Sequence, residues 1–166
     1  MSRSLRPFVL AVCLAASSYA NAQGVIMQRN LSLGMAKIIA EAALAECRAK
    51  GFHTAVAVVD RAGQVIVLLR DEQASPQTTE MARRKAYTAR MFGVATADFQ
   101  KRTAGDQPVS AQRDVDDMLA LSGGIPIKVG TETIGGVGSS GSSLEQDDAC
   151  AKAGVAAVAE QLQAAQ

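Results

Sequence analysis

Residues 54–69 read TAVAVVDRAGQVIVLL, and this stretch decides the fold. Its first half is β-branched and continuous, which predicts a well-buried strand over 54–59. The DRAG segment then forms a turn in which Gly63 can adopt a positive φ angle. The apolar run at 65–69 returns as the second strand of a β-hairpin. A hairpin joins antiparallel strands, so the sheet built on it is expected to be antiparallel.

Helical patterns and a second hairpin surround this stretch. Apolar residues recur at three- and four-residue spacing over 31–50, which predicts a helix. Ser75 as a cap and Pro76 in the first turn predict a second helix start. Ser143 and Gln146 form a capping box for the last helix. The expected elements are helices at 31–50, 75–92, 96–101 and 144–162, strands at 125–129 and 133–137, and a short strand at 118–121.

The order of these elements indicates the fold class. Hairpins in place of strand–helix–strand crossovers predict an α/β fold of the α+β type, with an antiparallel sheet of about five strands. Helices would cover one or both faces of that sheet. Pro126 lacks a backbone N–H, so its strand is expected at a sheet edge or at a strand start. Thr96 is expected to cap the helix at 96–101, and a polar surface loop is expected over 103–117.

The first 22 residues have the pattern of a secretory signal peptide. Arg3 and Arg6 precede an apolar stretch at 8–16 that is too short to span a bilayer. The ANA sequence at 20–22 is a small-x-small cleavage site. Cleavage would leave 23–166 as a single periplasmic or secreted domain. A short uncleaved anchor is the alternative, and no other run is long and apolar enough to cross a membrane.

The charge of the mature chain is nearly balanced. The full sequence has 17 Lys and Arg residues against 16 Asp and Glu residues. Two of the basic residues, Arg3 and Arg6, leave with the signal peptide. The remaining net charge of about −1 gives no electrostatic reason to expect nucleic acid or an anionic membrane as a partner.

Two cysteines remain after signal cleavage, Cys47 and Cys150. An even pair in an exported protein suggests a disulfide. Cys47 lies late in the first predicted helix and Cys150 lies early in the last. The two would meet if those helices pack antiparallel, and two buried free thiols are the alternative.

A nucleotide cofactor is not expected. Residues 136–141 match the G-x-G-x-x-G spacing, but no second strand follows the next helix and no acidic residue follows at a strand end. A tight glycine-rich turn explains the spacing. The backbone N–H groups at the start of the last helix could still hold a carboxylate group.

A few side chains could carry chemistry. His53 is the one histidine, which limits zinc and hydrolase chemistry, and it is either a strand-end residue or a metal ligand. Tyr87 either packs at a boundary or ligates iron as tyrosinate. Met81 and Met91 are soft ligands that more often pack in a core. The basic residues of the second predicted helix are Arg83, Arg84, Lys85 and Arg90. This cluster is either a solvated helix face or an anion site.

Three blocks of sequence occur in a fixed order. The first is VAVVDRAGQ at 56–64, and the second is SPQ at 75–77 with RKAYTA at 84–89. The third is GGIPI at 123–127, followed by IGGVG at 134–138 and EQD at 145–147. Together they resemble the GlcG/HbpS family of small haem-binding proteins. No single block identifies the family, but all three in order make a specific signal.

The resemblance implies an antiparallel sheet flanked by helices with profilin-like layering, homo-oligomers, and binding of haem or a related tetrapyrrole. It also implies a haem contact by Thr88, although on physical grounds this hydroxyl is expected to bond back to a helix carbonyl. His53, Thr88 and Tyr87 are the candidates for the iron contact, and Arg84 and Lys85 are the candidates for the propionates. Aromatic residues are few, so a shallow or subunit-interface site is expected.

The expected function is that of an exported haem-binding protein, which acts as a carrier, a sensor or a haem-protective factor without turnover. A periplasmic redox or sensor protein is a candidate partner. The alternative is a haem-degrading enzyme, or an accessory protein to a periplasmic hydroxy-acid or alcohol oxidation system. No acid–base pair stands out apart from Asp60 and the basic cluster, so catalysis has less support. An interaction protein whose ligand site has decayed is the third interpretation.

Overall fold

Four antiparallel strands form one sheet in the order β2-β1-β4-β3. The computed structural model describes residues 24–165, so the predicted signal peptide at 1–22 lies outside the described residues. The strands are β1 (Ala55–Val59), β2 (Val65–Arg70), β3 (Gly124–Val129) and β4 (Glu132–Ser140). Both predicted hairpins form, and Pro126 lies on the edge strand β3 as expected. The antiparallel α+β fold is therefore confirmed.

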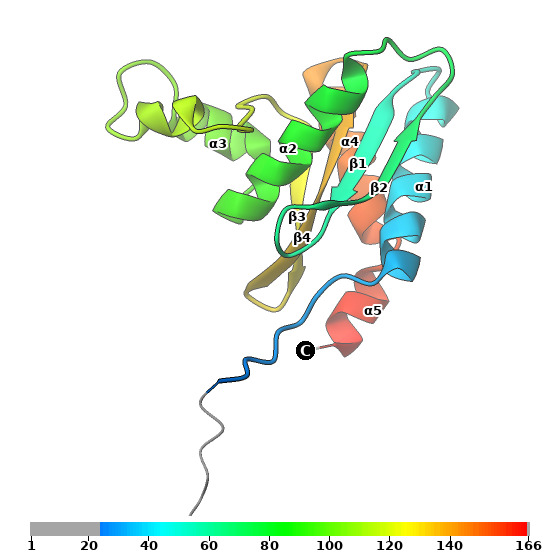
Figure 1. The fold of residues 1–166 in the computed structure, drawn as a ribbon. Helices are drawn as coiled ribbons and strands as arrows, with labels where there is room; N and C mark the ends of the chain where they lie inside the picture. Colours follow the sequence, from blue (N-terminus) through cyan, green and yellow to red (C-terminus); the bar gives the residue numbers. More distant parts are fainter. Residues whose placement is uncertain (1–23, 166) are drawn as a thin grey trace, which may run out of the picture.

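Helices cover both faces of the sheet (Figure 1). The side chains of Ala55, Ala57 and Val59 cluster with α2, whereas Val56 and Val58 belong to the core that α1 and α4 cover. All five residues of β1 are buried, as the continuous apolar run predicted. The helices are α1 (Leu33–Ala49), α2 (Thr78–Phe92), α3 (Thr96–Arg102), α4 (Leu144–Ala156) and α5 (Ala159–Ala164), with a 3-10 turn at Ser110–Asp114. Within 24–165, no helix combines the length and the apolar character needed to cross a membrane.

The prediction of a fifth strand at 118–121 is wrong, and within residues 24–165 the sheet has four strands. The segment is held against α2 by side chains instead. The N–H of Leu119 donates to the hydroxyl of Thr88 at 2.9 Å, and the carbonyl of Met118 accepts from the guanidinium of Arg84. Because side chains satisfy these backbone groups, the segment does not need a neighbouring strand.

Two helix starts differ from the prediction. α2 begins at Thr78, so Ser75 and Pro76 lie in a turn before the helix. The Ser75 carbonyl accepts from the N–H of Thr78 at 3.1 Å, which makes this turn an extension of the helix start. Thr96 is the first residue of α3 and not its cap. Its hydroxyl accepts from the N–H of Gly124 at 2.8 Å, so it ties α3 to the start of β3.

The last predicted helix starts where expected but is divided in two. Ser143 is the N-cap of α4, and its hydroxyl accepts from the N–H of Gln146 at 3.2 Å. The side chain of Gln146 donates to Sγ of Cys150 at 3.3 Å instead of completing the capping box. α4 ends at Ala156, and α5 begins at Ala159.

Glycines bring α2 very close to β4. A Cβ atom at Gly138 would lie 2.1 Å from the carbonyl oxygen of Ala82, and one at Gly136 would lie 2.4 Å from the carbonyl oxygen of Ala86. No side chain fits at either position, so the helix backbone rests directly on the strand. Because the inner side of α2 is fixed in this way, its other side is directed away from the sheet.

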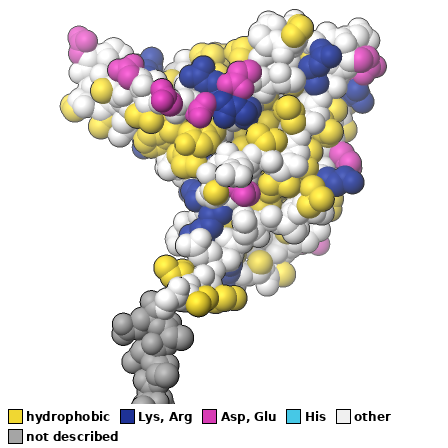
Figure 2. Space-filling model, viewed as in Figure 1, with side chains coloured by type: hydrophobic (Ala, Val, Ile, Leu, Met, Phe, Trp, Pro, Cys, Tyr) yellow, Lys and Arg dark blue, Asp and Glu magenta, His cyan; other side chains and the backbone are white. Residues whose placement is uncertain are grey.

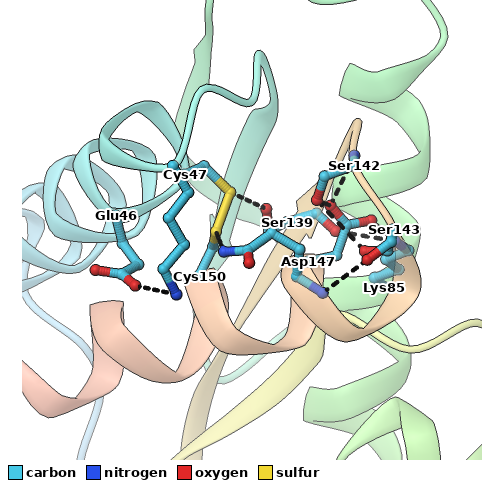
Figure 3. The surroundings of a disulfide bond; sticks show 10 residues. Glu46, Cys47, Lys85, Ser139, Ser142, Ser143, Asp147 and Cys150 are labelled. Atoms are coloured by element: carbon cyan, nitrogen blue, oxygen red, sulfur yellow. Dashed lines mark hydrogen bonds and ion pairs between the residues drawn. A yellow bond between two sulfur atoms is a disulfide. The ribbon is translucent and has the colours of Figure 1, made fainter.

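A disulfide joins Cys47 of α1 to Cys150 of α4 (Figure 3). Both cysteines are fully buried, and their Cα atoms lie 5.6 Å apart. The two helices run antiparallel, since Gly154 packs against Ile39 and Ala43 further along the same pair. The disulfide interpretation of the sequence is therefore confirmed. The bond fastens the helices on the face of the sheet opposite α2.

Lys85 and Asp147 form a buried ion pair that links α2 to α4 past the end of β4 (Figure 3). Nζ of Lys85 lies 2.7 Å from Oδ2 of Asp147 and donates to the carbonyl of Ser139 at 2.9 Å. Oδ1 of Asp147 accepts from the N–H and the hydroxyl of Ser142 at 3.1 and 2.7 Å. Burial lowers the pKa of the Lys85 ammonium, and the Asp147 charge opposes that shift. The network fixes three elements around one charge pair.

Replacing both cysteines by alanine is expected to lower the free energy of unfolding by about 2–5 kcal/mol, because a long loop is then no longer closed in the unfolded chain. The sequence separation between the cysteines is 103 residues. Urea unfolding of the mature chain, 23–166, with and without Cys47→Ala/Cys150→Ala measures the loss. Equal midpoints for both proteins would contradict the prediction.

Lys85→Met is expected to destabilise the protein by roughly 3–5 kcal/mol, because it leaves the Asp147 carboxylate buried without its counter-charge. Adding Asp147→Leu removes that charge too and is expected to restore part of the loss. A urea double-mutant cycle measures the coupling between the two positions. Strictly additive losses would show that the pair does not act as a unit.

Candidate functional site

The outer side of α2 and the neighbouring strand β2 expose apolar side chains. Tyr87 and Met91 lie one turn apart on α2, and both are partly exposed. On β2, Val65 and Leu68 are 42% and 46% exposed. Leu68 lies opposite Ala57, which packs on α2, so Leu68 points to the same side of the sheet as the helix. We call Val65, Leu68, Tyr87 and Met91 the open apolar face.

Charged side chains border this face. Figure 2, in the view of Figure 1, shows hydrophobic side chains gathered over α2 between groups of basic and acidic residues. Arg83 of α2 pairs with Glu80 and with Asp117, at 2.7 and 2.5 Å. An exposed apolar surface next to charged residues is typical of an interaction or ligand-binding site.

The β1–β2 turn closes one end of the open apolar face. Asp60 Oδ1 accepts from the N–H groups of Ala62 and Gln64 at 2.8 and 2.9 Å, which fixes the turn. Gly63 has a φ angle of 82° and packs so tightly that an added Cβ would lie 2.4 Å from Cε of Met91. The same atom would lie 2.6 Å from a ring carbon of Tyr87. The DRAG motif therefore positions the Tyr87 ring.

Thr88 is buried beneath this surface with its hydroxyl engaged. The hydroxyl donates to the carbonyl of Arg84 at 2.8 Å, as physical reasoning predicted, and accepts from the N–H of Leu119 at 2.9 Å. Arg84 is half-buried and donates through Nη2 to the carbonyl of Met118, and its Nε is buried without a partner in the described residues. The haem contact implied for Thr88 stays a prediction. Such a contact would compete with both hydrogen bonds of this hydroxyl.

His53 lies at the other end of β1. Its imidazole is partly exposed, and Nδ1 lies 3.0 Å from Oδ1 of the buried Asp71. The N–H of Gln73 and the guanidinium of Arg48 lower the pKa of the Asp71 carboxyl to about 2, and His53 contributes in the same direction. A carboxylate on one ring nitrogen orients the other nitrogen for a metal or a ligand. Five strand residues, about 16 Å, separate His53 from the turn beside Tyr87.

The basic cluster of α2 does not form one surface. Lys85 is inside the protein with Asp147, whereas Arg83 pairs with acidic side chains outside. Arg90 lies on the side of α2 that meets the β1–β2 turn, near Arg61. One monomer thus brings together Tyr87, Thr88 and Arg84, but places Lys85 in the interior and His53 at a distance.

The start of α4 is occupied by its own side chains. The Asp147 carboxylate accepts from the N–H of Ser142, and Ser143 caps the N–H of Gln146. These contacts use the Gln146 N–H, which is one of the first-turn groups that the sequence offered to a carboxylate ligand, and place the Asp147 carboxylate beside that turn. In the part of the chain that the structure describes, no group of three or more His, Cys, Asp or Glu residues could hold a metal ion.

The exposed side chains of β2, Val65 and Leu68, were not among the residues that the sequence singled out. Residues 65–69 are apolar throughout, so their composition predicts a buried strand. Their exposure depends on β2 being an edge strand that α2 does not cover, which is a property of the sheet order.

Comparisons with known proteins agree with this fold. The chain matches the family described as "Haem degrading protein HbpS-like" over residues 31–156. The crystal structure of HbpS has a TM-score of 0.78 at 35% identity, and the match covers 82% of this chain and 96% of that chain. A double mutant of Streptomyces reticuli HbpS has a TM-score of 0.77 at 30% identity, covering 93% of this chain and 97% of that one.

A third similar structure is that of a PduOC:Heme complex. It has a TM-score of 0.71 at 26% identity and covers 76% of this chain and 94% of that chain. Of the three sequence blocks that resemble the GlcG/HbpS family, the first covers β1 and the β1–β2 turn, and most of the second lies on α2. The third lies on β3, β4 and the start of α4. On the family match and the agreement with the HbpS structures, the chain belongs to the GlcG/HbpS (HbpS-like) family.

Proposed function

We propose that this protein binds haem or a closely related tetrapyrrole on the open apolar face. The observation that carries the proposal is the exposed apolar surface formed by α2 and the edge strand β2. The close packing of α2 on the glycines of β4 fixes the position of this surface. A related structure, the PduOC:Heme complex, holds haem on a similar fold, and the family description refers to haem.

The residues of this face fit one side of a haem. Val65 and Leu68 supply aliphatic contacts, and Tyr87 and Met91 supply an aromatic ring and a soft thioether. A flat surface covers one side of a macrocycle and leaves the other side in water. A second protomer would cover the other side, so we propose that the binding unit is a homo-oligomer with the ligand at or near a subunit interface.

Tyr87 is our first candidate for the iron contact. It lies on the open face and is held by Gly63, whereas the hydroxyl of Thr88 already makes two hydrogen bonds. A phenolate is a known haem ligand, and a neutral threonine hydroxyl is a weaker donor to iron. Arg84, half-buried next to this face, is the nearby basic group. His53 would reach a haem from the opposite end of β1, through a second protomer.

We propose that the protein is exported and works as a carrier, a sensor or a haem-protective factor. A disulfide between two fully buried cysteines is expected in an oxidising compartment. The basic and apolar start of the chain, with ANA at 20–22, supports cleavage of a signal peptide. A periplasmic redox or sensor protein is the proposed partner for the loaded form.

Haem degradation is the second candidate, because the matching family is described as haem degrading. Catalysis would need a general acid or base near the ligand. Asp60 is the carboxylate closest in sequence to the turn beside Tyr87, but its Oδ1 accepts two backbone hydrogen bonds. Binding without turnover is therefore the function that the geometry supports best.

Haemin added to the mature protein is expected to give a shifted Soret band with saturable stoichiometry. Tyr87→Phe is expected to weaken binding about tenfold or more and to change the spectrum, because it removes the iron contact and keeps the ring. Thr88→Val and His53→Ala are expected to keep the spectrum of the parent protein. No spectral change at micromolar haemin would end the proposal, and a loss confined to His53→Ala would move the iron contact to that residue.

The loaded protein is expected to keep its Soret band when ascorbate and oxygen are added. Absorption spectra over time, followed by extraction of the pigment, distinguish the two candidate functions. Steady loss of the Soret band with formation of an open-chain tetrapyrrole would favour haem degradation. Free haemin under the same conditions is the control for non-enzymatic bleaching.

A further inference from the structure

A cavity of about 420 Å³ opens beside the β1–β2 turn. It is lined by Gln28, Asn30, Arg61, Ala62 and Arg90. Arg90 comes from α2, three residues after Tyr87, and the turn that supplies Arg61 and Ala62 continues into Gly63, which packs on Tyr87. The β1–β2 turn therefore lies between the cavity and the open apolar face. Figure 2 shows basic side chains on this side of the protein, above the N-terminal segment.

The guanidinium of Arg90 is partly desolvated, and no carboxylate of residues 24–165 forms an ion pair with it. Its Nε is buried, and no group in the described part of the chain bonds to it. Burial lowers the pKa of Arg90, the charge of Arg61 lowers it further, and Asp60 opposes the shift. A cation that is taken out of water next to another cation costs stability unless an anion joins it.

Arg61 lies in a network of charged groups next to Arg90. Arg61 and Arg29 both donate to the carboxylate of Glu132. The Asp60 carboxylate lies near Arg90 but holds the backbone N–H groups of the turn. Arg61 is therefore shared with Glu132, whereas no ion pair within residues 24–165 joins Arg90.

We propose that this cavity is an anion site that holds one carboxylate group between Arg90 and Arg61. Guanidinium groups bind carboxylates through two parallel hydrogen bonds, and Arg90 and Arg61 both line the cavity. The side-chain oxygen of Asn30 accepts from the N–H groups of Arg61 and Leu31, at 3.1 and 2.9 Å, which leaves its amide nitrogen as a further donor.

The assignment of this carboxylate to a bound tetrapyrrole rests on the proposed function. A tetrapyrrole on the open apolar face carries carboxylates as propionate side chains, and a small free carboxylic acid is the other source. Both sources present the same group to the two arginines. The site itself can be tested without haem, so its failure and the failure of haem binding are distinguishable.

The first arm of the test titrates the ¹⁵N-labelled mature protein with acetate, against sodium chloride at equal ionic strength. We expect acetate to shift the amide signals of Arg61 and Ala62 in the parent protein and in Lys37→Gln. Lys37 is an exposed residue on α1, on the opposite face of the sheet, so its variant controls for the lost charge. In Arg90→Gln, the shifts are expected to disappear.

The same variants also test whether Arg90 is a structural residue. Arg90→Gln removes a partly buried charge that has no ion pair within the described residues, so the thermal midpoint without ligand is expected to stay equal or to rise. A lower midpoint, together with unchanged acetate shifts, would overturn the proposal. Arg90→Lys keeps the charge without the two-point geometry and is expected to retain only part of the acetate response.

The second arm compares haemin with haemin dimethyl ester, whose propionates carry no charge. If the propionate is the source, Arg90→Gln weakens haemin binding about tenfold and leaves ester binding unchanged. If a small free acid is the source, acetate shifts persist in the parent protein while Arg90→Gln binds both haemins as the parent does. The absence of acetate shifts together with equal haemin binding by parent and Arg90→Gln would overturn the site.

Discussion

The direct contact between the backbone of α2 and the glycines of β4 is the constraint on which the rest of the structure depends. At Gly136 and Gly138 there is no room for even a methyl group below the carbonyls of Ala82 and Ala86. The helix therefore sits low over β4 and β1 and does not cover β2. This position leaves Leu68 exposed beside the outer side of the helix and places Tyr87 under the β1–β2 turn.

The helices on the two faces of the sheet are fixed by different contacts. The contacts on one face contribute mainly to stability, and those on the other leave a surface for function. On one face, α1 and α4 cover the larger apolar core and are joined by a disulfide. On the other face, α2 is held by close backbone packing and by the Lys85–Asp147 ion pair, which reaches past β4 to α4. Because these contacts use the inner side of α2, the side chains on its outer side are available for a ligand or a second protomer.

Local sequence patterns predicted the parts of the fold that depend on near neighbours. The β-branched run with its DRAG turn predicted the hairpin. Helix periodicity placed Cys47 late in the first helix and Cys150 early in the last, but the bond between them depended on antiparallel packing, which the local pattern left open. The local pattern failed where a distant partner decides the outcome. Lys85 looked like part of a surface basic cluster, but Asp147, 62 residues away, holds it inside. Thr96 looked like a helix cap, but its hydroxyl binds Gly124, and Leu119 lies beside Thr88 and not in a fifth strand.

The most direct test of this account maps a bound haem onto the two faces of the sheet. Ferric haem broadens the NMR signals of nearby nuclei, so an amide spectrum of the ¹⁵N-labelled mature protein with haemin locates the ligand. The account predicts that broadening is strongest at Val65, Leu68, Tyr87 and Met91 and is weak at Ile39 and Ala151, which lie in the core on the α1–α4 side. Broadening centred on the α1–α4 side, with sharp signals along α2, would contradict it.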